Sequence, residues 1–271
     1  MDFKELQDAA VAAAMSAGDV IVREMSNDSR TDYFRKQATD FVTAVDREAE
    51  ALILAVLSDR FPDIPVLAEE SGSSGTSHSY RWIIDPLDGT TNFIHGYPWV
   101  AVSIALEKCQ AGKSFGDPVV GVVLNPVSRD LFTAYQGHGA FLNGRRLHVS
   151  PIERLDDSLV ATGFPLPERD ILDEFLSVFK EIFKRSHGIR RAGSAALDFA
   201  WIAAGAVDGF WEFGLSPWDT AAGALLIREA GGIVTDFMGG DHWLDSGNIA
   251  AGTAGVHREI LEVIQKIRSG Q

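Results

Sequence analysis

Apolar side chains recur at intervals of three and four residues near the start of the chain. The spacing over residues 3–25 fits one face of a helix, and a second stretch of this kind covers about residues 43–57. A turn that contains two prolines precedes residues 66–68, a short strand pattern that ends at Glu69. The polar, glycine-rich residues 71–79 follow, and we expect them to form a loop long and flexible enough to act as a lid.

The middle of the chain is predicted to form a sheet. Runs of apolar and β-branched residues mark strands at residues 82–84, 100–107, 119–124 and 131–135. The pair Asn143-Gly144 is typical of a type I′ hairpin turn between two such strands.

Helical patterns return in the second half of the chain and alternate with strands. They occupy residues 170–185, 195–206 and 218–230, and a strand pattern follows at residues 233–235. We therefore predict one unit over residues 1–271, with an N-terminal α+β half of about residues 1–145 and a C-terminal α/β half of about residues 146–271. The seam between the halves is expected within residues 139–169.

Composition and charge narrow the class of protein. Of the 271 residues, 46% are hydrophobic and 23% are charged, which is typical of a globular protein. The formal net charge of −14 disfavours general binding to nucleic acid or to anionic lipid. Cys109, the single cysteine, cannot form an internal disulfide, and neither a signal-peptide pattern nor a membrane-spanning apolar run is present. We expect a cytoplasmic protein that binds no nucleic acid and no membrane.

Four acidic residues stand where predicted strands end or a predicted helix begins: Glu69, Asp85, Asp88 and Asp219. Two carboxylates about 4 Å apart repel each other by about 4 kcal/mol at an effective dielectric constant of 20, so four in one cleft require cations. A ligand set made only of oxygen atoms favours a hard divalent ion, Mg²⁺ first and Mn²⁺ second.

The residues around these acids are suited to a bound phosphate. In the stretch Asp85-Pro-Leu-Asp-Gly-Thr-Thr-Asn-Phe93, the carbonyl of Leu87 can serve as a further ligand, and Gly89 allows close approach of the backbone. Thr90 or Thr91 is expected to cap the following helix, whose first amides could bind phosphate. The same residue types are also ordinary in turns and caps, so this stretch alone does not decide between the two interpretations.

Three motifs occur in order along the chain. They are Leu67-Ala-Glu-Glu-Ser71, Trp82-Ile-Ile-Asp-Pro-Leu-Asp-Gly-Thr-Thr-Asn-Phe93, and Pro217-Trp-Asp-Thr-Ala-Ala-Gly223 running to Glu229-Ala-Gly-Gly232. Together they resemble the inositol monophosphatase family, within the fructose-1,6-bisphosphatase-like superfamily, over nearly the whole chain. The resemblance implies an α/β fold (α+β in some schemes), built as a layered α-β-α-β-α sandwich.

The resemblance also implies a set of metal ligands: Glu69, Asp85, the Leu87 carbonyl, Asp88 and Asp219. It implies two or three Mg²⁺ ions per site, which Mn²⁺ may replace. Thr90 is implied to work with Glu69 in orienting a water molecule, and Asp46 to support Thr90, although a surface acid in the first turn of a helix explains Asp46 equally well. Glu70 is expected beside the ligand set, and an exchange of roles between Glu69 and Glu70 stays open.

The implied substrate contacts lie at Asp88, Gly89, Thr90, Gly193, Ser194, Ala195 and Glu212. A carboxylate at Glu212 can accept hydrogen bonds from a polyol such as inositol 1-phosphate, or it can pair with an ammonium group such as that of histidinol phosphate. No clear basic cluster for a second phosphate is present, and the pairs Arg145-Arg146 and Arg190-Arg191 leave sugar (bis)phosphates as a weaker alternative.

The expected activity is Mg²⁺-dependent hydrolysis of a small phosphate monoester by in-line attack of a metal-activated water. The resemblance further implies a homodimer and sensitivity to lithium. Some bacterial members of the family are partners of the transcription machinery, which provides an alternative of a different class. Other candidate chemistries fail: Gly112-Lys113-Ser114 lacks the first glycine of a nucleotide-binding loop, where Glu107 stands, and the histidines show no metal-ligand spacing.

Overall fold

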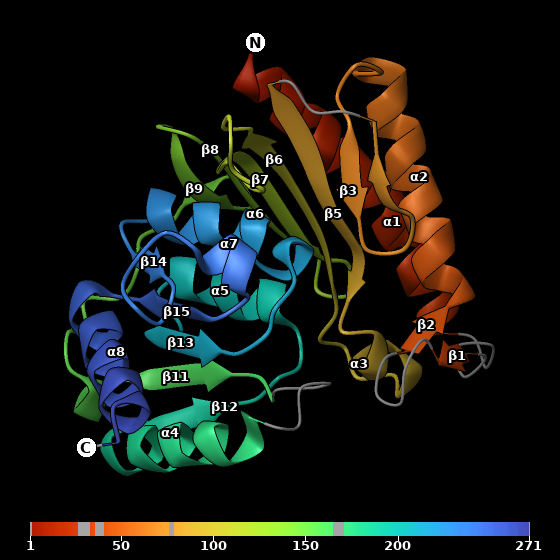
Figure 1. Ribbon diagram of the computed structural model, residues 1–271. Coiled ribbons are helices and arrows are strands. Elements are labelled where there is room, and N and C mark those ends of the chain that lie inside the picture. Colours follow the sequence, from red (N-terminus) through yellow and green to blue (C-terminus); the bar gives the residue numbers. More distant parts are fainter. Residues whose placement is uncertain (1, 27–32, 36–40, 76–78, 165–170, 271) are drawn as a thin grey trace.

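The computed structural model describes residues 2–26, 33–35, 41–75, 79–164 and 171–270. In these residues the strands form an eight-stranded sheet, a five-stranded sheet and a separate pair, β1 (Tyr33–Arg35) with β2 (Phe41–Thr43). The two larger sheets lie in separate layers with helices between them (Figure 1).

The eight-stranded sheet has the strand order β10-β9-β8-β7-β6-β5-β3-β4. Its strands are β3 (Val66–Ala68), β4 (Gly72–Ser74), β5 (Tyr80–Asp88), β6 (Ala101–Lys108), β7 (Asp117–Asn125), β8 (Asp130–Tyr135), β9 (Gly139–Leu142) and β10 (Arg145–Arg146). Neighbouring strands are antiparallel except β3 and β5, which are parallel. Strands β6 and β7 are buried almost throughout, since helices cover both faces of the sheet.

The five-stranded sheet has the order β12-β11-β13-β15-β14. Its strands are β11 (Leu159–Thr162), β12 (Gly188–Arg190), β13 (Gly209–Glu212), β14 (Ile233–Thr235) and β15 (Ile249–Gly252). A 3₁₀ turn, η2 (Leu155–Asp157), precedes β11. Four of these strands were not predicted from the sequence, because runs of three or four residues are too short to show a periodicity.

The helices form three layers around the two sheets (Figure 1). Helices α1 (Phe3–Met25) and α2 (Ala44–Arg60) cover the outer face of the eight-stranded sheet, while α5 (Ala195–Ala203) and α6 (Pro217–Glu229) lie between the sheets. Helices α4 (Leu172–Arg185) and α8 (Ala254–Arg268) cover the outer face of the five-stranded sheet, and α3 (Thr90–Ile94) and α7 (Trp243–Ser246) are short connectors. The predicted α-β-α-β-α sandwich is confirmed.

Most predicted elements are found, with differences at their ends. The second helix runs to Arg60 and the helix that begins at Ala195 stops at Ala203. The predicted loop at residues 71–79 begins instead as strand β4, and residues 76–78 lie outside the described part of the chain. Asn143 and Gly144 have φ angles of 49° and 81°, as a type I′ turn requires. The division into two halves stays a prediction.

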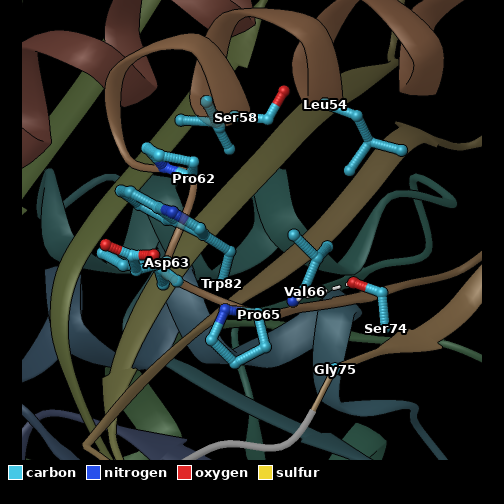
Figure 2. Close-up of a pocket in the computed structure, with 11 residues that line it drawn as sticks. Leu54, Ser58, Pro62, Asp63, Pro65, Val66, Ser74, Gly75 and Trp82 are labelled. Carbon is cyan, nitrogen blue, oxygen red and sulfur yellow. Dashed lines mark hydrogen bonds between the residues drawn. The ribbon is translucent and has the colours of Figure 1, made fainter.

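A groove of about 400 Å³ lies beside the end of α2 (Figure 2). Leu54, Pro62, Pro65, Val66 and Trp82 contribute to its lining. It contains none of the predicted site residues. No helix in the described residues has both the length and the apolar character needed to cross a bilayer.

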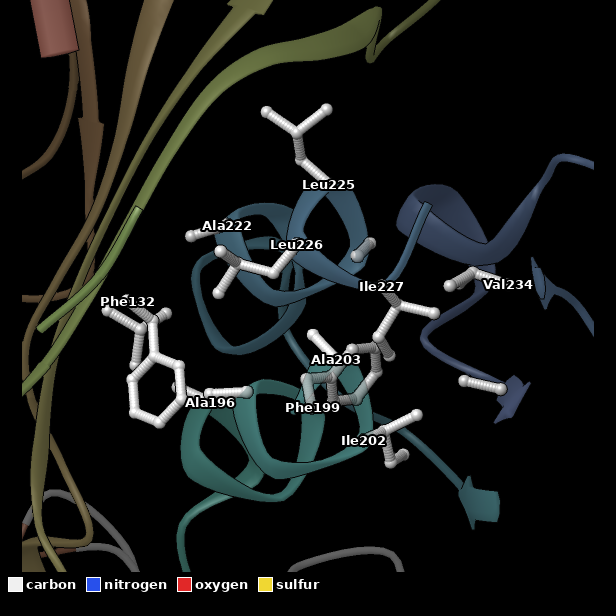
Figure 3. Packing of buried hydrophobic residues seen from close by; sticks show 14 of the residues in the cluster. Phe132, Ala196, Phe199, Ile202, Ala203, Ala222, Leu225, Leu226, Ile227 and Val234 are labelled. Atoms are coloured by element: carbon white, nitrogen blue, oxygen red, sulfur yellow. The ribbon is translucent and has the colours of Figure 1, made fainter. Parts of the chain in front are cut away.

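The two helices of the middle layer pack closely against each other. Helices α5 and α6 face each other through side chains such as Phe199 and Leu226 (Figure 3). A Cβ atom on Gly223 would lie 2.4 Å from Cβ of Phe199, so only glycine allows the two helices to come this close. This packing affects the predicted metal ligands, because Asp219 lies in the first turn of α6 and the N-cap residue of α5, Ser194, bonds to Asp88.

Glu229 at the end of α6 ties the middle layer to the hairpin between β8 and β9. Its carboxylate accepts hydrogen bonds from Gly137 N (2.8 Å) and Gly139 N (2.7 Å). In Glu229→Ala both N–H groups lose their acceptor, so we expect the free energy of unfolding in urea to fall by about 1–3 kcal/mol.

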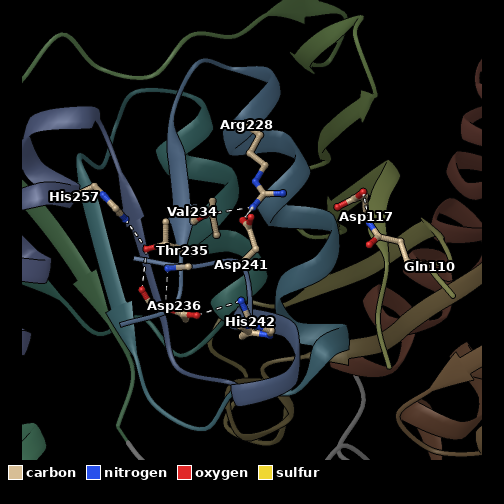
Figure 4. Close-up of polar contacts among 10 residues, drawn as sticks. Gln110, Asp117, Arg228, Val234, Thr235, Asp236, Asp241, His242 and His257 are labelled. Atoms are coloured by element: carbon tan, nitrogen blue, oxygen red, sulfur yellow. Dashed lines mark hydrogen bonds and ion pairs between the residues drawn. The ribbon is translucent and has the colours of Figure 1, made fainter. Parts of the chain in front are cut away.

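A matched control is Asp241→Ala. Asp241 forms a 3.3 Å ion pair with Arg228, and its side chain is 85% exposed (Figure 4). Exposed pairs contribute little, so we expect a loss below about 1 kcal/mol. Equal losses in the two variants would contradict the role given to Glu229.

Candidate metal and phosphate site

Three of the predicted acids meet at one point. Oxygen atoms of Asp85, Asp88 and Asp219 lie within 4.8 Å of one another. Asp85 and Asp88 belong to β5, whereas Asp219 belongs to α6 in the middle layer. The site therefore forms where the eight-stranded sheet meets the helices that separate it from the second sheet.

An irregularity in β5 brings its two acids to the same side. Asp85 pairs with Ser103 and Asp88 with Ala101, so three steps along β5 match two along β6. Residues three apart point to opposite faces of a regular strand, and one extra residue reverses this. Strand β5 thus continues through both acids, whereas the sequence analysis placed them after its end.

Asp219 is positioned by the start of α6. Pro217 occupies the first turn of the helix, and Ser216 is the N-cap residue. The Ser216 N–H donates to Asp219 Oδ2 at 2.7 Å, which completes a capping box. The carboxylate is thereby fixed in the first turn of the helix.

Asp88 is bound by the start of α5. Its Oδ2 accepts hydrogen bonds from Ser194 Oγ (2.6 Å) and from Ala196 N (2.8 Å). Ser194 is also the N-cap residue of α5, so its side chain both caps the start of this helix and holds Asp88. The predicted substrate residues Gly193, Ser194 and Ala195 therefore lie next to the acids.

Glu69 borders this trio. Its backbone N–H donates to Ile84 O at 3.1 Å, which continues the parallel pairing of β3 with β5. Its charge raises the pKa of both Asp85 and Asp219. The predicted ligand Glu69 is thus close enough to interact, although its carboxylate is outside the most compact group.

Burial and mutual repulsion dominate the electrostatics. Burial raises the pKa of Asp85 well above its ordinary value, and the charges of Glu69, Asp88 and Asp219 raise it further. The pKa of Asp219 is raised for the same reasons. Burial raises the pKa of Asp88 to about 6, against the opposing effects of Ser194, Ala196 and the Arg191 charge. A buried group of repelling oxygen donors fits a hard divalent cation.

Asp46 and Thr90 form a second contact between distant segments. Thr90 Oγ1 lies 3.1 Å from Asp46 Oδ1 and 3.2 Å from the Leu87 carbonyl oxygen, and it can donate to either. Asp46 is 1% exposed, and its Oδ2 accepts a hydrogen bond from Thr43 N at 2.8 Å. Burial raises its pKa to about 6. The interpretation of Asp46 as a surface acid is therefore wrong.

The cap of α3 differs from the prediction. Gly89, not Thr90 or Thr91, is the N-cap residue, and no side chain caps this helix. Gly89 has a φ of 94°, and a Cβ atom there would lie 2.9 Å from the carbonyl oxygen of Trp99. Thr90 is the first helical residue, and its hydroxyl is engaged with Asp46 and Leu87 instead.

Glu212 lies at the end of β13, beside the other acids. Burial raises its pKa well above the ordinary value; the charges of Asp198 and Asp219 add to this, and Arg191 opposes it. A Cβ atom on Gly163 would lie 1.8 Å from Glu212 Oε1, so Gly163 makes room for the carboxylate. Sequence analysis missed Gly163, for which the sequence contains no local signal.

Asn92 was also missed as a structural residue of the site, although it is part of the second motif. Its Nδ2 lies 2.7 Å from Trp99 O and 3.0 Å from Ala192 O. It therefore ties the turn after β5 to the segment that precedes Gly193. The sequence feature that pointed to Asn92 was its position directly after Thr90 and Thr91 in the second motif.

Several residues outside the predicted ligand and substrate sets lie in ordinary structural positions. Arg145 and Arg146 form the exposed edge strand β10, and His138 stacks on Tyr135 with ring centroids 4.3 Å apart. Phe210 and Trp211 are buried in the core. His78 lies outside the described residues. The positive charge of Arg191 opposes the raised pKa of Asp88 and of Glu212.

Comparisons with known proteins agree with this geometry. The sequence model of the inositol monophosphatase family matches residues 2–269. Nus factor SuhB of Pseudomonas aeruginosa is 48% identical over 261 residues, 94% of each chain, and inositol-1-monophosphatase of Mesorhizobium japonicum is 45% identical over 257 residues, also 94% of each chain. The crystal structure of extragenic suppressor protein suhB from Bartonella henselae shares 42% identity and superposes with a TM-score of 0.90, covering 97% of this chain and 99% of that one. The chain belongs to the inositol monophosphatase family.

Proposed function

We propose that this protein is a Mg²⁺-dependent phosphatase of small phosphate monoesters, with inositol 1-phosphate as its preferred substrate. The observation that carries the proposal is the convergence of Asp85, Asp88 and Asp219, whose oxygens lie within 4.8 Å of one another. Membership of the inositol monophosphatase family supports the same reaction class.

In this proposal the metal ligands are Glu69, Asp85, the Leu87 carbonyl, Asp88 and Asp219. When bound there, Mg²⁺ (or Mn²⁺) neutralises the acids and lowers the pKa of a water molecule. The protein contributes rigid positioning: Asp88 is held by Ser194 and Ala196, and Asp219 by the N–H of Ser216. Fixed donors and acceptors of this kind stabilise charge in a phosphoryl-transfer transition state without reorganising.

Thr90 and Glu69 are proposed to orient the attacking water. Because the Thr90 hydroxyl hydrogen points to Asp46 or to Leu87, the lone pairs of Oγ1 stay available to accept a hydrogen bond from that water. The hydrogen bond from Thr43 N to Asp46 Oδ2 holds the Asp46 carboxylate in place. Asp46 Oδ1 therefore offers a fixed acceptor to the Thr90 hydroxyl. Glu69, in the turn that follows β3, supplies a carboxylate as the second acceptor.

The substrate is proposed to bind with its phosphate at the backbone of Gly89 and Thr90. Its alcohol portion would lie between Gly193, Ser194, Ala195 and Glu212. Glu212 is a carboxylate that can accept hydrogen bonds from several hydroxyl groups of a polyol, which favours inositol. The name of the Mesorhizobium japonicum relative, inositol-1-monophosphatase, supports this choice over histidinol phosphate.

Loss of one ligand tests the proposed reaction. In Asp219→Asn a negative donor of the compact trio becomes neutral, so we expect phosphate release from inositol 1-phosphate to fall by on the order of 100-fold or more. Phosphate release is measured with Mg²⁺ for inositol 1-phosphate, histidinol phosphate and a sugar bisphosphate. The measurement with inositol 1-phosphate is repeated with lithium added. Asp241→Asn, an exposed acid elsewhere, serves as the control. No release from any ester by the wild type would contradict the proposal, and faster release from histidinol phosphate would contradict the choice of substrate.

The acids also predict how stability depends on pH in metal-free protein. The pKa of Asp88 in the fold, about 6, exceeds its ordinary 3.8, so its contribution to stability is complete below about pH 4 and is lost as the pH rises through 6. With chelator present, the Asp88→Asn variant should lose less stability than the wild type between pH 4.5 and 7.5, by about 1–2 kcal/mol. Urea unfolding at both pH values measures this difference.

Metal addition provides the control for that experiment. Mg²⁺ or Mn²⁺ should raise the stability of the wild type more at pH 7.5 than at pH 4.5, because protonated acids bind metal poorly. Asp88→Asn should respond less at the higher pH. Equal stabilisation at both pH values would argue against a carboxylate site.

A second candidate function comes from the names of the relatives. Several close relatives, including that of Pseudomonas aeruginosa, are named Nus factor SuhB, which motivates a role as a partner of the transcription machinery. Asp88→Asn separates the two functions, since a loss of turnover with retained biological effect would assign that effect to binding alone.

We further propose that the protein is a cytoplasmic homodimer, as the family resemblance implies.

A further inference from the structure

Helix α2 carries two buried carboxylates one turn apart. Asp46 is 1% exposed and Glu50 is 4% exposed. Residues at positions i and i+4 share a face of a helix, so both side chains point toward the same region of the molecule. Asp46 reaches Thr90, in the turn after β5. Glu50 reaches a different turn.

The partner of Glu50 is the peptide group next to Glu69. Glu50 Oε2 accepts a hydrogen bond from the backbone N–H of Glu70 at 2.9 Å. Ala68 pairs with Gly72, so residues 69–71 form the turn between β3 and β4. The preceding N–H, that of Glu69, is bound to Ile84 O. The backbone of Glu69 is therefore held on one side by the sheet and on the other by α2.

Burial of the Glu50 carboxylate opposes folding, so its hydrogen bond to Glu70 N indicates a specific role. A backbone N–H in a turn can bond to water, yet here a carboxylate is taken out of water to accept from it. Hydrogen bonds to an ionised acceptor are about twice as strong as neutral ones, and the N–H of Glu70 belongs to the same planar peptide as the carbonyl of Glu69. Fixing that plane fixes the direction in which the Glu69 side chain leaves the backbone.

We propose that Glu50 is a positioning residue for the metal site, which acts by holding the Glu69–Glu70 peptide so that Glu69 faces Asp85 and Asp219. This inference rests on the proposed function in so far as Glu69 is assigned to the ligand set. The capping box between Thr43 and Asp46 anchors the start of α2. One rigid helix thereby sets the relative positions of Thr90 and Glu69, the two residues proposed to orient the water.

Two variants of equal size isolate the hydrogen bond. Glu50→Gln keeps an oxygen that can accept from Glu70 N, and Glu50→Met fills the same volume without such an acceptor. The control is Glu48→Met on the same helix, where an exposed Glu48 pairs with Arg23 at 3.0 Å. Mn²⁺ affinity is measured by calorimetry without substrate, and kcat and KM are measured with Mg²⁺ and inositol 1-phosphate.

We expect Mn²⁺ to bind at least tenfold more weakly to Glu50→Met, as is typical when a residue that orients a ligand is lost. Its kcat should fall while KM changes by less than about threefold, since the hydrogen bond that Glu50 accepts holds the turn at Glu70, which contains none of the proposed substrate residues. Glu50→Gln should stay within about threefold of the wild type in Mn²⁺ affinity, and Glu48→Met should be unchanged.

Equal Mn²⁺ affinity in Glu50→Met and Glu50→Gln would overturn the role of Glu50 while leaving the proposed function intact. Failure of Glu50→Met to fold would also overturn it, because Glu50 would then act on the whole fold rather than on one turn. A wild type that binds no Mn²⁺ would instead refute the proposed metal site, and with it the role of Glu50.

Discussion

Repulsion among buried carboxylates is the constraint on which this site depends. Asp85, Asp88 and Asp219 hold oxygen atoms within 4.8 Å of one another, and burial raises the pKa of all three. The charges of neighbouring acids raise the pKa of Asp85 and Asp219 further. Such a group would separate unless each member were fixed by the backbone near it. A strand irregularity fixes the first two, and a capping box fixes the third.

The site is consequently a property of the layer between the two sheets. Helix α5 binds Asp88 through Ser194, and α6 carries Asp219. Both helices pack closely because Gly223 leaves space for Phe199. A change in this packing would move acids from opposite sides of the site relative to each other, so the core and the chemistry cannot vary independently.

Helix α2, in the outer layer, also contacts residues of this site. Helix α2 extends Asp46 to the turn that holds Thr90 and Glu50 to the turn that holds Glu69. Burying these two acids opposes folding, and the hydrogen bonds they accept offset part of that cost. The arrangement places three layers of the sandwich around one small group of oxygen atoms.

The sequence by itself determined the longer helices, the central strands and the hairpin at Asn143, and its motifs singled out Glu69, Asp85, Asp88 and Asp219. Periodicity, turn chemistry and motifs are local properties of the chain. Only the tertiary structure decided that Asp46 is buried, that Gly89 caps α3, and that Gly163 makes room for Glu212. It also decided that Asp88 meets Ser194, a residue 106 positions away, and that Glu50 reaches Glu70. These contacts depend on how sheets and helices pack, which spacing along the chain does not encode.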